Sequence, residues 1–155
     1  MAISSGDLVE KFGTQDTVSA SGGTSSVSDN SFSVEADAEV WTNDDNAPQA
    51  GIALTIQKSA GTWSGSIGVF VRLMNIDGTT DEGVIDSANE RHYLGGFEPD
   101  SNQVNATDQT YGLRVALPNT VDSQTFEFYL ENQTGISIAS GWVLKVTPIT
   151  AGPKA

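Results

Sequence analysis

Alternation of apolar and polar residues is the strongest signal in this sequence, and it is clearest between residues 124 and 148. One side of the extended chain carries the apolar members, which are Phe126, Phe128, Leu130, Trp142, Leu144 and Val146. A turn signal at 132–135 lies between the two halves. A period of two residues predicts strands with one buried face. We therefore predict two antiparallel strands here, and each needs a second sheet to cover its apolar face.

The same period recurs along most of the chain. It is present in the segments 32–40, 52–56, 67–73, 92–97 and 111–117. Polar connections rich in Gly, Asn, Asp and Pro separate these segments, and helical periodicity is nearly absent. Connections of about ten or more residues favour strands that cross between sheets over a simple meander. The pattern predicts an all-β, jelly-roll-like β-sandwich of about seven or eight strands.

The first 31 residues differ in composition from the rest of the chain. The run from Ser19 to Ser31 is mostly Ser, Gly, Thr and Asp, and Val27 is its only apolar residue larger than alanine. Such a segment buries too little apolar surface to fold alone. We therefore predict an extended N-terminal arm over residues 1–31, a sandwich domain over 32–150 and a short C-terminal tail over 151–155.

Three apolar residues in the predicted arm, Leu8, Val9 and Phe12, point to a contact surface. Apolar side chains exposed on a free tail would promote nonspecific adhesion, whereas burial in a groove of a partner would stabilise a complex. Two interpretations stay open: a plain solubilising tail, and an arm that becomes ordered on a neighbour. We name these three residues as the candidate partner interface.

Charge and composition exclude several classes of function. The chain of 155 residues has 20 Asp plus Glu, 7 Lys plus Arg, no cysteine and a formal net charge of -13. An acidic chain of this kind does not displace counterions from phosphate, so nucleic acid is not an expected partner. The missing cysteines exclude disulfides and thiolate metal sites. No apolar run reaches the roughly 20 residues of a membrane helix, and no secretion signal starts the chain, so we expect synthesis in a cytoplasm and no membrane partner.

Two loops have the oxygen-rich composition of calcium-binding segments. Counted from Asn75 in the loop 75–82, the sixth and twelfth positions, where an EF-hand needs Gly and Glu, are Thr80 and Asp86. The loop 43–46 has the same kind of composition. The favoured interpretation of both loops is a tight turn.

The carboxylates and the single histidine do not form a recognisable catalytic set. Glu127 and Glu131 are four residues apart on one predicted strand, or about 13 Å, whereas a retaining glycosidase holds its pair about 5 Å apart. His92 has no cysteine to accompany it in a zinc site and is interpreted as a strand-edge residue. The sequence also has no nucleophile elbow or phosphate-binding glycine loop. We predict that the protein is not an enzyme and has no cofactor and no metal site.

Aromatic residues provide an alternative binding site. Trp41, Trp63 and Trp142, together with Tyr93 and Tyr111, would suit a sugar-stacking platform, although such residues more often belong to a core. Trp63 lies in a Gly/Ser/Thr-rich loop and is the residue that we expect to be exposed. The alternative function is therefore a glycan-binding β-sandwich module.

Three stretches of the chain together resemble small virion structural proteins of tailed bacteriophages. They are DLVEKFGT at 7–14, RLMNIDGT at 72–79, and GWVLKVTP at 141–148 with the ending GPKA at 152–155. The resemblance extends over most of the chain, and none of the stretches is a catalytic signature. It is closest to proteins that decorate or cement the head.

This resemblance implies a function, a location and partners. It implies a capsid decoration or cement protein on the outer surface of the head, where it binds the major capsid protein and stabilises the shell. It also implies a homo-oligomer, with a trimer as the first expectation, attached through an extended terminal arm. A tail structural component of similar size and β content is the alternative location.

Overall fold

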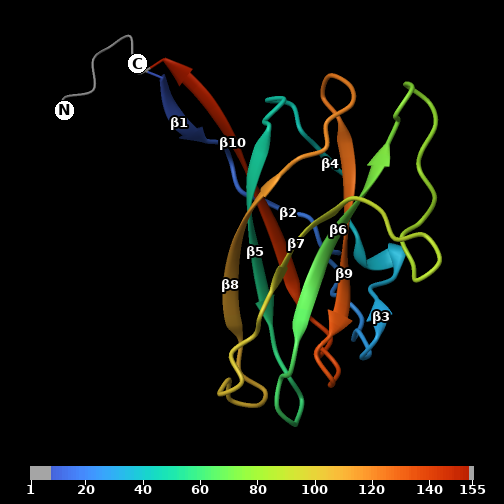
Figure 1. The fold of residues 1–155 in the computed structure, drawn as a ribbon, viewed down its shortest axis with the longest axis vertical. Helices are drawn as coiled ribbons and strands as arrows, with labels where there is room; N and C mark the ends of the chain where they lie inside the picture. Colours follow the sequence, from blue (N-terminus) through green and yellow to red (C-terminus); the bar gives the residue numbers. More distant parts are fainter. Residues whose placement is uncertain (1–7, 154–155) are drawn as a thin grey trace.

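The computed structural model describes residues 8–153, which form two antiparallel sheets packed face to face (Figure 1). The first sheet has the order β1-β10-β5-β8, with β2 also paired to β10. Its strands are β1 (Leu8–Phe12), β2 (Asp16–Thr17), β5 (Gln49–Ile56), β8 (Gln109–Ala116) and β10 (Val143–Pro153). The second sheet has the order β3-β9-β6-β7, with β4 also paired to β9. Its strands are β3 (Ser31–Phe32), β4 (Trp41–Thr42), β6 (Ser66–Met74), β7 (Tyr93–Phe97) and β9 (Thr125–Gln133).

The pairing of the strands is nested from the ends of the chain inward. β2 pairs with β10, β4 with β9, β5 with β8, and β6 with β7. This is the pairing of one long hairpin rolled into two sheets, which is the jelly-roll arrangement. Pairing of β10 with β5 and of β9 with β6 then closes each sheet. The predicted all-β, jelly-roll-like sandwich is confirmed.

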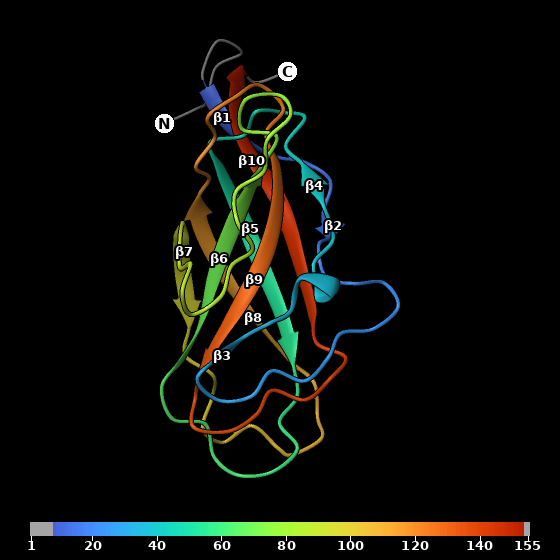
Figure 2. The ribbon, with the colours of Figure 1, turned by 90° about the vertical axis from the view of Figure 1, so that its right-hand side faces the viewer.

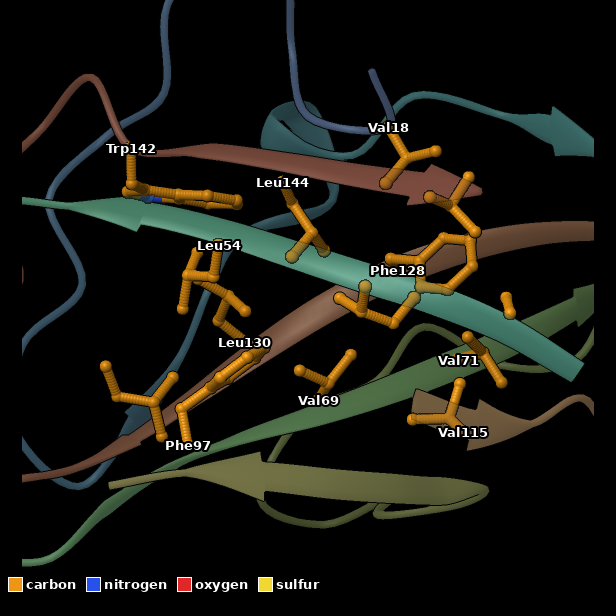
Figure 3. Close-up of a cluster of buried hydrophobic side chains, with 14 of the residues drawn as sticks. Val18, Leu54, Val69, Val71, Phe97, Val115, Phe128, Leu130, Trp142 and Leu144 are labelled. Carbon is orange, nitrogen blue, oxygen red and sulfur yellow. The ribbon is translucent and has the colours of Figure 1, made fainter. Parts of the chain in front are cut away.

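The core lies between the sheets and follows the predicted alternation. On β5 every second residue is buried, so Ala50, Ile52, Leu54 and Ile56 face inward. Side chains from both sheets meet in the middle, among them Leu54 and Leu144 from one sheet and Val69 and Phe128 from the other (Figure 3). Burial of these apolar faces against each other is the main force that holds the two sheets together.

The predicted strand over residues 32–40 is wrong. The structure has the short strand β3, a single 3-10 turn η1 (Glu35–Asp37) and then β4. Val34 is 53% exposed and Val40 57% exposed, so two of the apolar residues that suggested a strand do not enter the core. Alternation alone does not make a strand. Strand propensity depends on packing against neighbouring strands, and Val34 and Val40 do not pack against a sheet in this way.

The structure also differs from the predicted division at residue 31. Val18 is 1% exposed and Val27 is 2% exposed, and both belong to the main core. The N–H of Val18 donates to the carbonyl of Leu144 at 2.9 Å, beside the β2–β10 pairing. Residues 16–31 contain too few apolar groups to fold alone, but they pack against the rest of the sandwich, where Val18 and Val27 are buried.

The C-terminal end differs from the predicted tail in a similar way. β10 continues through Pro153, so residues 151–153 belong to a strand, while residues 154–155 lie outside the described part of the chain.

The pairing of β6 with β7 is irregular, because the register shifts between Val69 and Phe70 of β6. Gly95 has a φ of 156°, which residues with a side chain rarely adopt, and a Cβ there would lie 2.9 Å from a methyl group of Leu113.

Helical structure in residues 8–153 is limited to the three-residue η1 turn, so no helix in this part of the chain has the length needed to cross a bilayer.

Candidate functional site

The candidate site is a two-stranded ribbon at one end of the first sheet. It consists of β1 and residues 149–153 of β10, and we call it the β1–β10 ribbon. β10 pairs with β5 only as far as Ile149, so residues 150–153 pair with β1 alone. The ribbon therefore extends beyond the other strands, at the top of the molecule in both ribbon views (Figures 1 and 2).

Two large apolar side chains are exposed on one face of this ribbon. Leu8 is 75% exposed and Phe12 is 67% exposed. They are four residues apart on a strand, so both side chains are on the same face, with Glu10 between them. Val9 is half-buried and belongs to the opposite face. The structure thus brings two of the three predicted interface residues together on one surface and places the third behind them.

An ion pair connects the ribbon to the rest of the sheet. Arg114 on β8 donates to both carboxylate oxygens of Glu10 and to the side-chain carbonyl of Gln49 on β5. The hydrogen bond and the positive charge of Arg114 lower the pKa of Glu10, and Glu10 in turn raises the pKa of Arg114. Because Arg114 is next to the buried Val115 on its strand, it lies on the outer face of the sheet. The exposed Leu8 and Phe12 therefore belong to this same outer face.

The ribbon contains features that the sequence did not reveal. Leu8, Val9 and Phe12 were expected on a free arm, whereas they lie on a strand that is paired with β10 over its full length. Arg114 and Gln49, which fix the ribbon in place, had no signal in the sequence, because Arg114 is 104 positions away from Glu10 and 65 positions away from Gln49. Strand pairing between the two ends of the chain is a long-range contact that local periodicity cannot predict.

The expected exposure of Trp63 is wrong. Trp63 is 3% exposed, and its indole N–H donates to the side-chain oxygen of Gln103 at 2.9 Å. Trp41 and Trp142 are also buried, at 6% and 2% exposure. Each tryptophan N–H has a buried or partly buried partner, as expected for core residues. A sugar-stacking platform made of these tryptophans is therefore not present on the surface.

The loop 75–82 is a turn stabilised by its own side chains. Both carboxylate oxygens of Asp77 accept hydrogen bonds from Thr79 and Thr80. These bonds, first of all the one from the Thr79 backbone, lower the pKa of Asp77 to about 2. Within residues 8–153 there is no group of three or more His, Cys, Asp or Glu side chains arranged to hold a metal ion.

The second sheet carries a buried polar network on its outer face. The guanidinium of Arg72 on β6 donates to Glu127 on β9 at 2.9 Å, to Glu35 of η1 at 2.6 Å and to the backbone carbonyl of Glu82 at 2.6 Å. The hydroxyl of Tyr129 donates to Glu127 at 3.1 Å. Burial alone would lower the pKa of Arg72, but its bonds to the two carboxylates raise it. Every member of this network has a partner, so the geometry is that of a structural clamp.

His92 is part of the same region. Its Nε2 lies 2.8 Å from Oε1 of Glu82, whose other oxygen accepts the N–H of Leu73 at 3.0 Å. Burial alone would raise the pKa of Glu82, but these hydrogen bonds lower it. The histidine thus helps to hold the β6–β7 connection against the sheet, and no nucleophile lies within hydrogen-bond distance of it.

Comparisons with known proteins concern the fold. No protein-family model matches the sequence, and no curated protein matches it. A structure of the infectious bursal disease virus Gx strain is similar with a TM-score of 0.38 and 13% identity over 97% of this chain and 37% of that chain. The VP2 subviral particle of infectious bursal disease virus is similar with a TM-score of 0.34 and 14% identity over 94% of this chain and 36% of that chain. The chain thus spans little more than a third of each of these proteins.

Proposed function

We propose that this protein is a virion structural protein of a tailed bacteriophage, and that it decorates or cements the outside of the head. In this proposal it docks on the major capsid protein through the β1–β10 ribbon. The observation that carries the proposal is the pair of exposed apolar side chains, Leu8 and Phe12, on a ribbon that extends beyond the rest of the sandwich.

The energetics of the ribbon favour a docking role. Burying each of these side chains on a partner would contribute on the order of 1.5 to 3 kcal/mol. A flexible arm would lose much of this contribution to the entropy of ordering. β1 is already held by its pairing with β10 and by the Glu10–Arg114 ion pair, so less conformational freedom is lost when it binds. The ribbon is therefore better preorganised for docking than the free arm that the sequence suggested.

The remaining candidate functions have less support. The glycan-binding alternative relied on exposed tryptophans, and all three are buried. A tail structural component would use the β1–β10 ribbon in the same way. The location of the protein on the phage particle, head or tail, decides between these two functions. The buried, fully paired networks around Arg72 and Glu127 provide no free acid, base or nucleophile and support a non-enzymatic role.

The proposal is tested by binding to phage particles that lack the protein. The double variant Leu8→Ser with Phe12→Ser should fold as the wild type and lose particle binding. The matched control is Val34→Ser with Val104→Ser, which removes two other exposed apolar side chains, at 53% and 68% exposure, and should bind normally. Wild-type binding by the Leu8 and Phe12 variant would overturn the proposal.

A deletion of residues 1–13 provides a second test that keeps the core intact. It removes β1 but retains β2 and the buried Val18. A longer deletion through residue 18 is unsuitable, because Val18 packs in the main core. The shorter deletion should leave a folded sandwich, visible in its circular dichroism spectrum, that no longer binds particles.

A further inference from the structure

The outer edge of β1 offers a row of backbone groups for pairing. In the ribbon, the N–H of Gly13 donates to the carbonyl of Pro148 at 2.9 Å. Backbone groups of successive residues point to opposite edges of a strand, so Val9 and Lys11 also face β10. The N–H and C=O groups of Leu8, Glu10 and Phe12 therefore face away from β10. Within residues 8–153, no strand pairs with β1 along that edge.

The edge of β1 belongs to a part of the molecule that the rest of the first sheet does not support. Beyond Ile149 the ribbon has two strands only, and a two-stranded ribbon alone is marginally stable in water. Natural proteins protect exposed strand edges by covering or pairing them. Among residues 8–153 no strand pairs with this edge of β1, and its five residues include no proline.

We propose that this edge pairs with β1 of a second copy of the chain, antiparallel and about a two-fold axis at Glu10. The two ribbons then form one four-stranded segment, and the first sheets of the two copies become continuous. This proposal goes beyond docking on a shell and does not depend on it, because its interchain hydrogen bonds come from the backbone edge of β1. A two-fold dimer would replace the trimer expected from the sequence resemblance.

The residues of β1 select this register. With Glu10 on the axis, Leu8 of one copy faces Phe12 of the other, and all three outward-facing residues form hydrogen-bonded pairs, or about six interchain bonds. Apolar cross-strand pairs of this type stabilise a sheet. A shift by two residues would place Leu8 opposite Glu10 and Phe12 opposite position 6, which precedes the five residues of β1. The centred register is therefore the one that satisfies both the backbone and the side chains.

The local charges are compatible with self-pairing although the whole chain is acidic. Two Glu10 carboxylates would face each other on the axis, and like charges in that position are unfavourable. Each carboxylate, however, is already bound by the guanidinium of its own Arg114. Lys11 adds a further positive charge on the same strand. The ribbon thus has as many positive as negative groups in a chain with a formal net charge of -13.

The first test is the mass of the protein in solution, measured by sedimentation over a series of concentrations. The wild type should reach the mass of a dimer. Glu10→Pro removes an N–H that faces the free edge and leaves the β1–β10 bonds in place. It should weaken dimerisation at least about 100-fold, through the two lost bonds on the axis and the proline ring. The control Glu10→Ala also loses the ion pair but keeps the N–H, and it should still dimerise.

Cysteine cross-linking tests the register, because the natural chain has no cysteine. In the proposed dimer the two Cα atoms at position 10 are about 5.5 Å apart, which is within reach of a short thiol-to-thiol cross-linking reagent. Glu10→Cys should therefore cross-link efficiently with such a reagent. Leu8→Cys places its two thiols about 13 Å apart, four positions along the strand, and should not. The double variant Leu8→Cys with Phe12→Cys should cross-link again.

The outcomes separate this proposal from the proposed function. A wild type that is monomeric at all concentrations, or equal cross-linking of the position-8 and position-10 variants, would overturn the two-fold dimer whatever the particle-binding result. Equal dimerisation of Glu10→Pro and the wild type would overturn it as well. A dimer that behaves as described, but whose Leu8 and Phe12 variant still binds particles, would support the dimer and overturn the docking role alone.

Discussion

The outer faces of the two sheets differ in how they meet the solvent. The outer face of β3-β9-β6-β7 is covered by the β6–β7 connection, whose Ile85 is 1% exposed and packs with Phe70 and Tyr129 in a second apolar cluster. In the part of the chain that the structure describes, no comparable connection covers the outer face of β10-β5-β8. It carries small and polar side chains, such as Thr55 and Thr110, which share a hydrogen bond of 2.7 Å. Figure 2 shows the connection between β6 and β7 crossing only one side of the sandwich.

This difference indicates which surface is presented to partners. The outer face of β3-β9-β6-β7 is covered by the β6–β7 connection and held by a buried ion-pair network, so its residues stabilise the fold and are not accessible to a partner. The uncovered face is continuous with the outer face of the β1–β10 ribbon through the Glu10–Arg114 pair. Exposed apolar groups at the end of an otherwise polar, flat face are typical of an interaction surface. The predictions below test whether one face is structural and the other is free for binding.

The largest loss in the free energy of unfolding is expected when Arg72, at the centre of the covered face, is replaced. Arg72→Ala leaves the carboxylate of Glu127, whose side chain is 9% exposed, without its cation. Removal of one partner of a buried pair costs about 3 to 5 kcal/mol. Urea unfolding should show this loss in the free energy of unfolding. The double variant Arg72→Met with Glu127→Gln removes both charges and should recover most of the stability. A loss below about 1 kcal/mol for Arg72→Ala would contradict the structural role of the network.

The connection that covers this face should be the next most sensitive element. Ile85→Ala removes its most buried side chain and should cost about 2 to 3 kcal/mol, the lower part of the range for such changes, because a surface connection can relax into the space. Proteolysis within residues 75–92 should become faster at the same time. The control Val104→Ala changes a residue that is 68% exposed and should leave both measurements unaltered.

These two regions also show what the sequence could and could not predict. β5, β6, β8, β9 and β10 follow from alternation alone, because each has one face in the core. Val84 and Ile85 were visible only as an apolar interruption in a polar loop, since burial on the outside of a sheet leaves no periodic signal. Arg72 and Glu127 lie on neighbouring strands, so their contact depends on strand register.

The candidate site was predictable in part. Leu8, Val9 and Phe12 were recognisable as apolar residues without a local core. Their placement on a paired strand was not, because it requires the N-terminal and C-terminal segments to meet in β1–β10. Trp63 was misjudged for a related reason: a Gly/Ser/Thr-rich loop suggested exposure, whereas Gln103, 40 positions away, provides the buried partner of its indole N–H.

Acid should loosen the covered face at the β6–β7 connection. The folded-state pKa of Glu82 is lowered from 4.5, so the stability that its ionised form contributes is complete above that pH and is lost as the pH falls below it. Hydrogen exchange of the Leu73 N–H, which Glu82 accepts, should accelerate over this range. Glu82→Gln should flatten the pH dependence, and the control Glu98→Gln, at an exposed position, should not. An unchanged profile for Glu82→Gln would show that another group controls the loosening.

The smallest change in the free energy of unfolding is expected on the uncovered face. Two neighbouring positions of β5, one facing the solvent and one facing the core, should therefore differ strongly in their sensitivity to substitution. Thr55→Val with Thr110→Val removes an exposed cross-strand hydrogen bond but keeps two β-branched side chains, so the free energy of unfolding should change by less than about 0.5 kcal/mol. Leu54→Ala, one residue away on the buried side of β5, should cost about 2 to 5 kcal/mol. Urea unfolding of the two variants side by side measures this contrast. A loss above about 1 kcal/mol for the threonine pair would mean that the uncovered face also contributes to stability, and that it is not free to be presented to a partner.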